Sequence, residues 1–146
     1  FLCYGNINRS ALAHAYAAGK HVGTLRFASA GFHAPAGRPP DPTMVDVAAQ
    51  QGVALGDWRS CTLDAQAVDQ ADLILAMEIA HLDRLWAEHP GARGKSFLLG
   101  AASAGARHHV EVVDPYGKPR QTYERVCRQV LQSVDAWLAM WPDHTP

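Results

Sequence analysis

The chain has 146 residues, with 13 Lys and Arg against 14 Asp and Glu, so its formal net charge is -1 when the 8 histidines are counted neutral. This length suits one domain whose core needs no metal or disulfide, and the near-zero charge argues against nucleic acid or an anionic membrane surface as a partner. Nowhere do 18 apolar residues run without a charge, so we expect no membrane-spanning helix, and the first twenty residues show no basic stretch that leads into an apolar one, so we expect no signal peptide.

Three cysteines, Cys3, Cys61 and Cys127, are too few and too widely spaced for a secreted disulfide framework or a zinc site. We therefore expect a protein of the reducing cytoplasm. The chain opens abruptly, because Phe1 and Leu2 lead directly to Cys3 although a buried strand normally needs four or more apolar residues. We expect the natural start to lie a few residues upstream.

Short apolar runs alternate with helical patterns along the chain. The first residues predict a strand, which a helical pattern over 11–16 follows, and the runs 25–28, 72–77 and 96–99 predict three more strands. Asp41 as N-cap, Pro42 in the first turn and Gly52 as a stop signal predict a helix over 42–51. Apolar residues at helical spacing predict a last helix over 122–140, whereas 100–106 is expected to be a loop. The pattern predicts one α/β domain over 1–146 with a parallel sheet.

The most informative segment is Cys3-Tyr4-Gly5-Asn6-Ile7-Asn8-Arg9-Ser10, between the first strand and the first helical pattern. Five residues between Cys3 and Arg9 can wrap into a cup of inward N–H groups, to which the helix adds the positive end of its dipole. Such a cup binds phosphate and favours a thiolate at Cys3, while Arg9 offers a planar fork to phosphoryl oxygens and Gly5 relieves strain in the turn. If each residue were considered alone, Cys3 would be interpreted as a buried cysteine at a strand end and Arg9 as a solvated residue of the first helical turn. Their spacing and their location between a strand and a helix favour a phosphate site instead.

A thiolate that accepts a phosphoryl group also needs an acid for the leaving oxygen and a base for the later attack of water. Asp114 is the candidate, because Pro115 keeps its backbone out of the helical region and Gly117 closes the turn. Without Cys3 and Arg9, the same Asp-Pro pair would be read as ordinary turn chemistry.

Cys3 to Ser10, together with Asp114-Pro115-Tyr116, resembles the low-molecular-weight protein tyrosine phosphatase family. The resemblance extends over nearly the whole chain, since residues 29–31, 40–42 and 73–77 follow in the order and spacing of that family. It implies a four-stranded parallel sheet flanked by helices on both faces, a phosphate-binding loop after the first strand, and hydrolysis of phosphotyrosine through a phosphocysteine intermediate without metal or other cofactor.

By position, the resemblance implies that Cys3 is the nucleophile, Arg9 the phosphate clamp and Asp114 the general acid. The residues that it places around the substrate are Tyr4, Gly5, Asn6, Ile7, Asn8, Ser10 and Tyr116, of which Tyr116 forms one wall of the cleft. Asn6, Ser10 and Ser29 correspond to the positions whose side chains brace the phosphate loop.

A finer resemblance is to the bacterial branch that counteracts the tyrosine kinases of capsule and exopolysaccharide export. It rests on His81-Leu82, 90–95, 99–100, 114–116, Tyr123 and Trp137. The resemblance implies a phosphotyrosine-containing protein, such as a bacterial tyrosine kinase, as partner. We expect a monomer or weak dimer.

The chain departs from the family pattern at Asn8, where the family commonly has a second cysteine that traps an oxidised nucleophile as a disulfide. We therefore predict that peroxide drives Cys3 up the oxidation ladder with no partner thiol in the loop. Ser10-Ala11 replaces the usual Ser-Pro, with a small expected effect on stability. Gly117 stands where many eukaryotic members carry a second aromatic, which should leave the cleft wall more open, and we expect Tyr4 to compensate by lining the mouth.

The remaining histidines and tryptophans have no spacing that indicates a metal site, and we interpret them as surface or packing residues. His33 and Arg38 share one long loop that could reach the cleft, although a solvated loop is the default interpretation. Two alternatives stay open: an arsenate reductase on the same fold, which needs further cysteines as a relay, and a non-catalytic anion-binding module, which needs neither a thiolate nor an acid.

Overall fold

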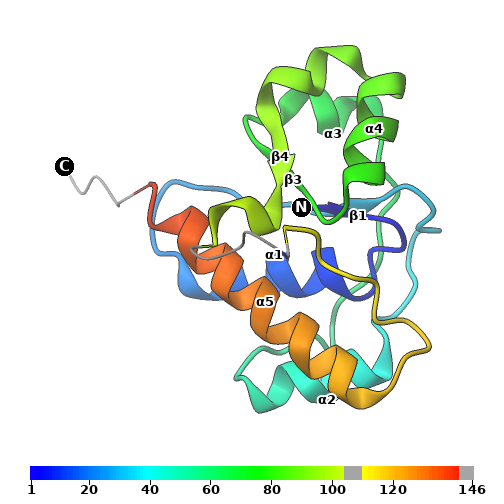
Figure 1. Cartoon of the computed structure of the whole chain (residues 1–146), viewed down its shortest axis with the longest axis vertical. Coiled ribbons are helices and arrows are strands. Elements are labelled where there is room, and N and C mark those ends of the chain that lie inside the picture. Colours follow the sequence, from blue (N-terminus) through cyan, green and yellow to red (C-terminus); the bar gives the residue numbers. More distant parts are fainter. Residues whose placement is uncertain (104–109, 142–146) are drawn as a thin grey trace.

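The computed structural model describes residues 1–103 and 110–141. Its strands are β1 (Leu2–Cys3), β2 (Ala30–Gly31), β3 (Ile74–Ala76) and β4 (Ser96–Leu98). They form one sheet in the order β2-β1-β3-β4, in which every neighbouring pair is parallel (Figure 1). The four-stranded parallel sheet expected from the sequence is confirmed.

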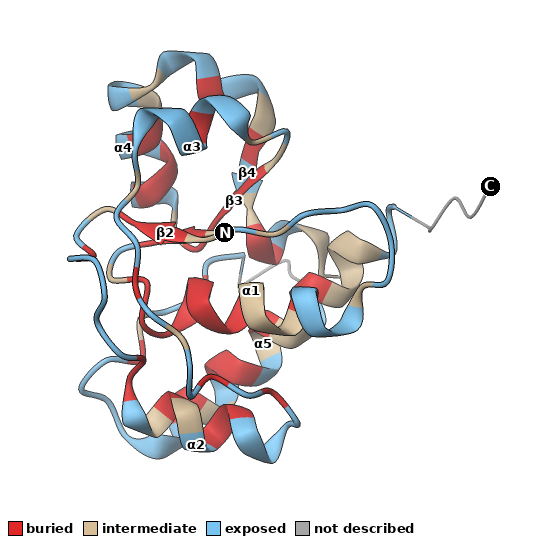
Figure 2. Ribbon diagram, turned by 180° about the vertical axis from the view of Figure 1, so that it is seen from behind, coloured by how far each residue is buried: buried red, intermediate tan, exposed pale blue. Residues whose placement is uncertain are grey.

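Helices cover both faces of this sheet. They are α1 (Arg9–Lys20), α2 (Pro42–Gln50), α3 (Ala65–Gln70), α4 (Ile79–Glu88) and α5 (Arg120–Leu138), with 3-10 helices η1 (Pro90–Lys95) and η2 (Leu99–Ala102). Figures 1 and 2 show α3 and α4 on one side of the strands and α1, α2 and α5 on the other. Among the described residues, no helix combines the length and apolar character that crossing a bilayer requires.

The strands supply side chains to a core on each face. Leu2 and Ile74 pack with Leu85 of α4, whereas their neighbours Cys3 and Leu75 belong to the larger core beneath α1, α2 and α5. Successive residues of a strand point to opposite faces, and a parallel sheet covered on both sides needs apolar residues at both. This explains why the strand sequences are continuous apolar runs.

The two helices predicted from capping and periodicity are confirmed. In α2, the Asp41 carboxylate accepts the backbone N–H of Thr43 at 3.0 Å, and Pro42 occupies the first turn. Helix α5 begins directly after Pro119 and is displaced by two residues at each end from the prediction, which is ordinary scatter for helix boundaries.

Two local predictions are wrong. Residues 25–28 form no strand and are mostly exposed, and β2 lies at Ala30–Gly31 instead. Strand β1 consists of Leu2 and Cys3, which pair with Ala30 and Gly31. Residues 25–27 therefore lie beyond the end of β1 and have no neighbouring strand, among the described residues, with which to pair. Residues 100–102, expected in a loop, belong to η2; residues 104–106 of the same prediction lie outside the described part of the chain.

The sheet order sets the position of the functional site. Strands β1 and β3 are neighbours, and the chain leaves β1 for α1 on one face and β3 for α4 on the other. In open parallel sheets, such a divergence creates a crevice beyond the carboxyl ends of the two strands. Cys3 is the last residue of β1, so it stands at this crevice.

Candidate active site

One pocket of about 260 Å³ at this crevice brings together residues from three distant parts of the sequence. Its lining comprises the phosphate loop (residues 3–9), His33 and Arg38 of the long loop after β2, and Asp114 and Tyr116. Nearly all the residues that the sequence predicted around the substrate therefore meet here, and Ser10 and Ser29 stand behind the loop.

Asn6 shapes the phosphate loop. It has a left-handed backbone (φ 52°) and is fully buried, and asparagine tolerates this conformation better than most residues. Its Nδ2 donates to Ser10 Oγ at 2.8 Å and Ser29 Oγ at 3.1 Å. Its Oδ1 accepts the backbone N–H of Cys61 at 2.8 Å, which fixes the amide on both sides. These contacts support the bracing role implied for Asn6, Ser10 and Ser29.

Two neighbouring segments hold the loop from outside. The indole Nε1 of Trp58 donates to the carbonyl oxygen of Asn6 at 2.9 Å, so Trp58 holds the loop as well as packing against His14. Gly31 lies so close to the loop that an added Cβ would stand 2.6 Å from the carbonyl oxygen of Tyr4. Any larger residue at position 31 would push the loop away from β2.

Cys3 Sγ sits where two donors converge. The backbone N–H of Asn6 donates to the sulfur at 3.3 Å, and Ser10 Oγ lies 2.8 Å from it. Because Ser10 Oγ already accepts from the Asn6 amide, its own proton is available to the sulfur. Hydrogen bonds of this kind strengthen as the acceptor becomes negative, so the arrangement suits a thiolate.

Arg9 is held at the base of the pocket by two carboxylates. The side chain is 2% exposed, and Nη1 donates to Glu78 Oε2 at 2.6 Å and to the carbonyl oxygen of Val112 at 2.8 Å. Nη2 lies 3.7 Å from Asp114 Oδ2. The alternative of a solvated Arg9 is therefore wrong, since the guanidinium is buried and held by its hydrogen bonds.

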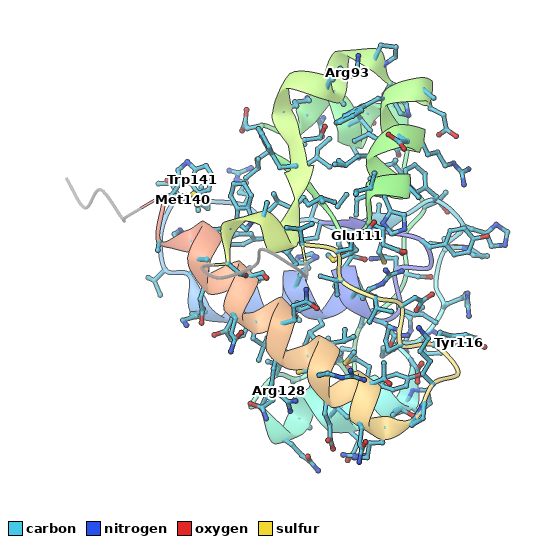
Figure 3. The ribbon with its side chains drawn as sticks, viewed as in Figure 1. Arg93, Glu111, Tyr116, Arg128, Met140 and Trp141 are labelled. Atoms are coloured by element: carbon cyan, nitrogen blue, oxygen red, sulfur yellow. The ribbon has the colours of Figure 1, made fainter. Side chains whose placement is uncertain are left out.

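Glu78 contacts the site through Arg9, and its role was not predicted from the sequence. It directly follows the predicted strand 72–77, so its position at the carboxyl end of a parallel strand was the available signal. Its helix is also capped from outside, because Glu111 Oε1, labelled in Figure 3, accepts the N–H of Ile79 at 2.8 Å. The carboxylate that holds Arg9 thus stands on a fixed helix start.

His81 orients Glu78 in turn. Its Nδ1 accepts the backbone N–H of Glu78 at 3.1 Å, and its Nε2 lies 3.3 Å from Glu78 Oε2. Burial, with a contribution from the Arg9 charge, lowers the pKa of His81 below its ordinary value. The ring is therefore neutral near pH 7 with its proton on Nε2, facing the carboxylate.

Asp114 presents its carboxylate to the pocket. Oδ1 accepts the backbone N–H of Tyr116 at 3.1 Å, which forms an Asx turn within the turn expected from Asp-Pro. The side chain remains 49% exposed, so it can exchange protons with solvent and with a bound substrate. Tyr116, labelled in Figure 3, is 64% exposed on the loop that leads into α5.

The mouth of the pocket has a second aromatic wall. The rings of Tyr4 and His33 stack with centroids 5.6 Å apart, and both residues line the pocket with Arg38. His33 and Arg38 are therefore pocket residues, not merely solvated loop residues. Within the described part of the chain, no three His, Cys, Asp or Glu side chains gather as a metal site would require.

Residues 1–143 match the family model described as low molecular weight phosphotyrosine protein phosphatase. The chain belongs to this family. The resemblance inferred from the motifs is therefore confirmed, and so is the expectation of a phosphatase enzyme.

Relatives and solved structures agree with the assignment. The chain is 34% identical over 137 residues to the probable low molecular weight protein-tyrosine-phosphatase EpsP of Ralstonia nicotianae, covering 94% of this chain and 90% of that protein. The crystal structure of the tyrosine phosphatase AmsI of Erwinia amylovora superposes with a TM-score of 0.85 at 33% identity, covering 95% and 89% of the two chains. The YwlE arginine phosphatase of Geobacillus stearothermophilus superposes with a TM-score of 0.88 at 27% identity, covering 96% and 89%.

Proposed function

We propose that this phosphatase hydrolyses phosphotyrosine in proteins by transferring the phosphoryl group first to Cys3 and then to water. The observation that carries the proposal is the meeting of Cys3, Arg9 and Asp114 in one pocket, with Arg9 Nη2 3.7 Å from Asp114 Oδ2. A nucleophile, a cation and a carboxyl group at one phosphate-sized cup are the parts that metal-independent phosphoryl transfer needs.

In the first step, the Cys3 thiolate attacks phosphorus and forms the S–P bond. The bond from phosphorus to the tyrosine oxygen breaks, and Asp114, in its protonated form, gives its proton to that oxygen. The backbone N–H groups of the loop and the fork of Arg9 stabilise the charge that spreads over the three other phosphoryl oxygens.

In the second step, water attacks the phosphocysteine. Asp114, now a carboxylate, takes a proton from the water as the S–P bond breaks, and inorganic phosphate leaves. The electron pair of that bond returns to Cys3 as a thiolate, which the Ser10 hydroxyl and the Asn6 N–H stabilise.

The walls of the pocket favour an aromatic substrate. Tyr4, stacked on His33, stands on one side, and Tyr116 lines the pocket from the loop before α5. A phenyl ring carrying the phosphate would contact these apolar ring faces, whereas the short side chain of phosphoserine would not reach them.

We further propose a bacterial tyrosine kinase of polysaccharide export as the physiological substrate and the cytoplasm as the site of action, with the enzyme as a monomer or weak dimer. The branch resemblance of His81, Tyr123 and Trp137 supports the partner. The three unpaired thiols, Cys3, Cys61 and Cys127, support a reducing compartment.

The test compares turnover of a phosphotyrosine peptide, a phosphoserine peptide and a phosphoarginine peptide in the presence of EDTA. We expect metal-independent turnover of the phosphotyrosine peptide, its abolition by Cys3→Ser, and a loss of about 10²-fold or more with Asp114→Asn. Asp64→Asn is the matched control, because Asp64 likewise accepts a backbone N–H at a turn, from Ala67 at 2.7 Å, but caps α3. Acid quenching during turnover should capture phosphate on Cys3.

Other outcomes would identify the alternatives. Preference for the phosphoarginine peptide would replace the tyrosine assignment with the activity named for YwlE. Arsenate reduction in the presence of a thiol reductant, without peptide turnover, would favour the reductase. Peptide binding that is the same in wild type and Cys3→Ser, again without turnover, would favour the binding module.

A further inference from the structure

A buried polar cluster adjoins the phosphate loop and includes one of its residues, Asn8. Asn8, Asp41 and Tyr123 are each at least nine-tenths buried. Asp41 Oδ2 accepts from Asn8 Nδ2 at 3.2 Å and from the Tyr123 hydroxyl at 2.7 Å. Three elements far apart in the sequence, namely the phosphate loop, the start of α2 and the first turns of α5, therefore meet at one carboxylate.

Asp41 is attached to the phosphate loop in two ways. Besides the Asn8 amide, its backbone N–H donates to the carbonyl oxygen of Ile7 at 3.1 Å. Its other carboxylate oxygen accepts the N–H of Thr43 in the first turn of α2, so the side chain cannot turn away. The position of Asp41 consequently fixes two consecutive residues of the loop that surrounds the phosphate.

Tyr123 links this carboxylate to the segment that carries the general acid. The acid loop (residues 114–119) is closed by a hydrogen bond from the N–H of Lys118 to the carbonyl oxygen of Pro115, and it leads directly into α5. The backbone of Gly117, in the acid loop, acts on the Tyr123 hydroxyl and slightly offsets the rise of its pKa. Tyr123 thus stands in the first turns of the helix that follows the acid loop, and its phenol contacts the residue that holds the phosphate loop.

The charges of the cluster suit a fixed link. Burial, and the hydrogen bond to Asp41, raise the pKa of Tyr123 to about 12. The phenol therefore keeps its proton throughout the range in which a phosphatase works, and it donates permanently to the carboxylate. A buried hydrogen bond to a charged acceptor is stronger and shorter than a neutral one, so it can hold two loops in register.

We propose that Tyr123 and Asp41 are positioning residues that hold the acid loop in register with the phosphate loop, so that the Asp114 carboxyl faces the oxygen leaving from the group on Cys3. This inference rests on the proposed function, because it assigns Asp114 the role of acid. Neither Tyr123 nor Asp41 lines the pocket, so they act through the two loops they join.

The inference has a kinetic signature. Phenolate of tyrosine is a poor leaving group that needs the acid, whereas p-nitrophenolate is a weaker base and leaves with little help from a proton. A displaced acid loop should therefore slow phosphotyrosine more than p-nitrophenyl phosphate. The difference between the two substrates should be seen in kcat/KM, because this ratio reports the transfer of the phosphoryl group to Cys3. The later hydrolysis of the phosphocysteine is the same step for both substrates.

The experiment uses Tyr123→Phe, which deletes only the hydroxyl. We expect kcat/KM for phosphotyrosine to fall roughly tenfold, within the factor of about a hundred that a 1 Å misplacement can cost, while kcat/KM for p-nitrophenyl phosphate changes by less than about threefold. Asp41→Asn, which keeps the size and the capping ability of the side chain, should show the same selectivity. Tyr16→Phe is the matched control, because its hydroxyl donates to Asp135 at 2.9 Å between α1 and α5, away from both loops.

Asp114→Asn provides the reference for a lost acid. If Asp114→Asn discriminates between the two substrates but Tyr123→Phe and Asp41→Asn slow both equally or not at all, the link between the loops is refuted and the proposed function stands. Equal discrimination by Tyr16→Phe would also refute it. If Asp114→Asn itself fails to discriminate, the acid role falls, and the positioning role falls with it.

Discussion

Replacing Glu78 by Gln removes a negative charge from the base of the pocket without changing the size of the side chain. Glu78 Oε2 accepts from Arg9 Nη1 at 2.6 Å, and the Arg9 side chain is 2% exposed. Removing one partner of a fully buried ion pair costs about 3–5 kcal/mol, because the other charge stays behind without compensation.

The cost at this site should be smaller for two reasons. Glu78 is 34% exposed, so solvent already screens the pair, and Arg9 keeps the Val112 carbonyl and the Asp114 carboxylate as neighbours. The glutamine oxygen can also still accept the N–H. We expect a loss of about 1–2 kcal/mol in the free energy of unfolding, which corresponds to a decrease of roughly 3–8 °C in Tm for a domain of this size.

Glu88→Gln is the matched control on the same helix. Glu88 Oε1 accepts from Arg84 Nε at 2.9 Å, but both side chains are nearly half exposed. Such an exposed pair contributes only about 0.3–0.5 kcal/mol, so Tm should fall by less than about 2 °C. Differential scanning calorimetry of the two variants checks the magnitudes. Turnover of a phosphotyrosine peptide should fall only in Glu78→Gln, because the hydrogen bond that orients Arg9 becomes weaker when its acceptor loses its charge.

Equal Tm values for the two variants would refute this reasoning. So would unchanged turnover in Glu78→Gln, since the anchoring of the guanidinium would then have no bearing on phosphoryl transfer.

Three further predictions concern other residues of the site. Trp58→Phe should lower the free energy of unfolding by about 1 kcal/mol and should also lower turnover. Trp137→Phe, which deletes a similar indole-to-carbonyl hydrogen bond away from the pocket, should lower only the stability. Equal turnover in the two variants would contradict this prediction. After peroxide and then dithiothreitol, Cys3 should remain oxidised in wild type but return to the thiol in Asn8→Cys, and the intact mass of the protein distinguishes the two states. Full recovery of the Cys3 thiol in wild type would contradict this prediction. Because burial lowers the pKa of His81, the unfolded chain protonates this histidine more readily than the folded chain, so the free energy of unfolding should decrease as pH falls below 6.5. Urea titrations should show a smaller decrease in His81→Gln. A decrease of the same size in wild type and variant would exclude His81 as its origin.

Local sequence was sufficient for much of the fold and for the chemical groups of the site. The segment from Cys3 to Ser10 predicts a strand, a phosphate loop and a helix because its signals are short-range: an apolar end, a glycine turn and a helical pattern. Capping by Asp41 and Pro42 likewise fixes the start of α2 within a few residues. The family follows from the same motifs, because their residue types and order are specific.

The exact place of β2 was decided by pairing. Residues 25–28 have the apolar and aromatic residues of a strand, yet the ladder to β1 forms at Ala30 and Gly31. Gly31 fits there because the phosphate loop passes too close for a side chain. Propensity cannot report this, since the constraint comes from a neighbour about 25 residues earlier in the sequence.

The partners of the site residues were decided by tertiary structure alone. Arg9 and Glu78 are 69 residues apart, and Tyr123 and Asp41 are 82 apart, so no periodicity or motif connects them. They meet because β1 and β3 are adjacent in the sheet and because α5 packs across α1 and α2. The sequence by itself determined which groups could react; the folded chain determined what holds them in place, because burial and hydrogen-bond geometry exist only between segments that folding brings together.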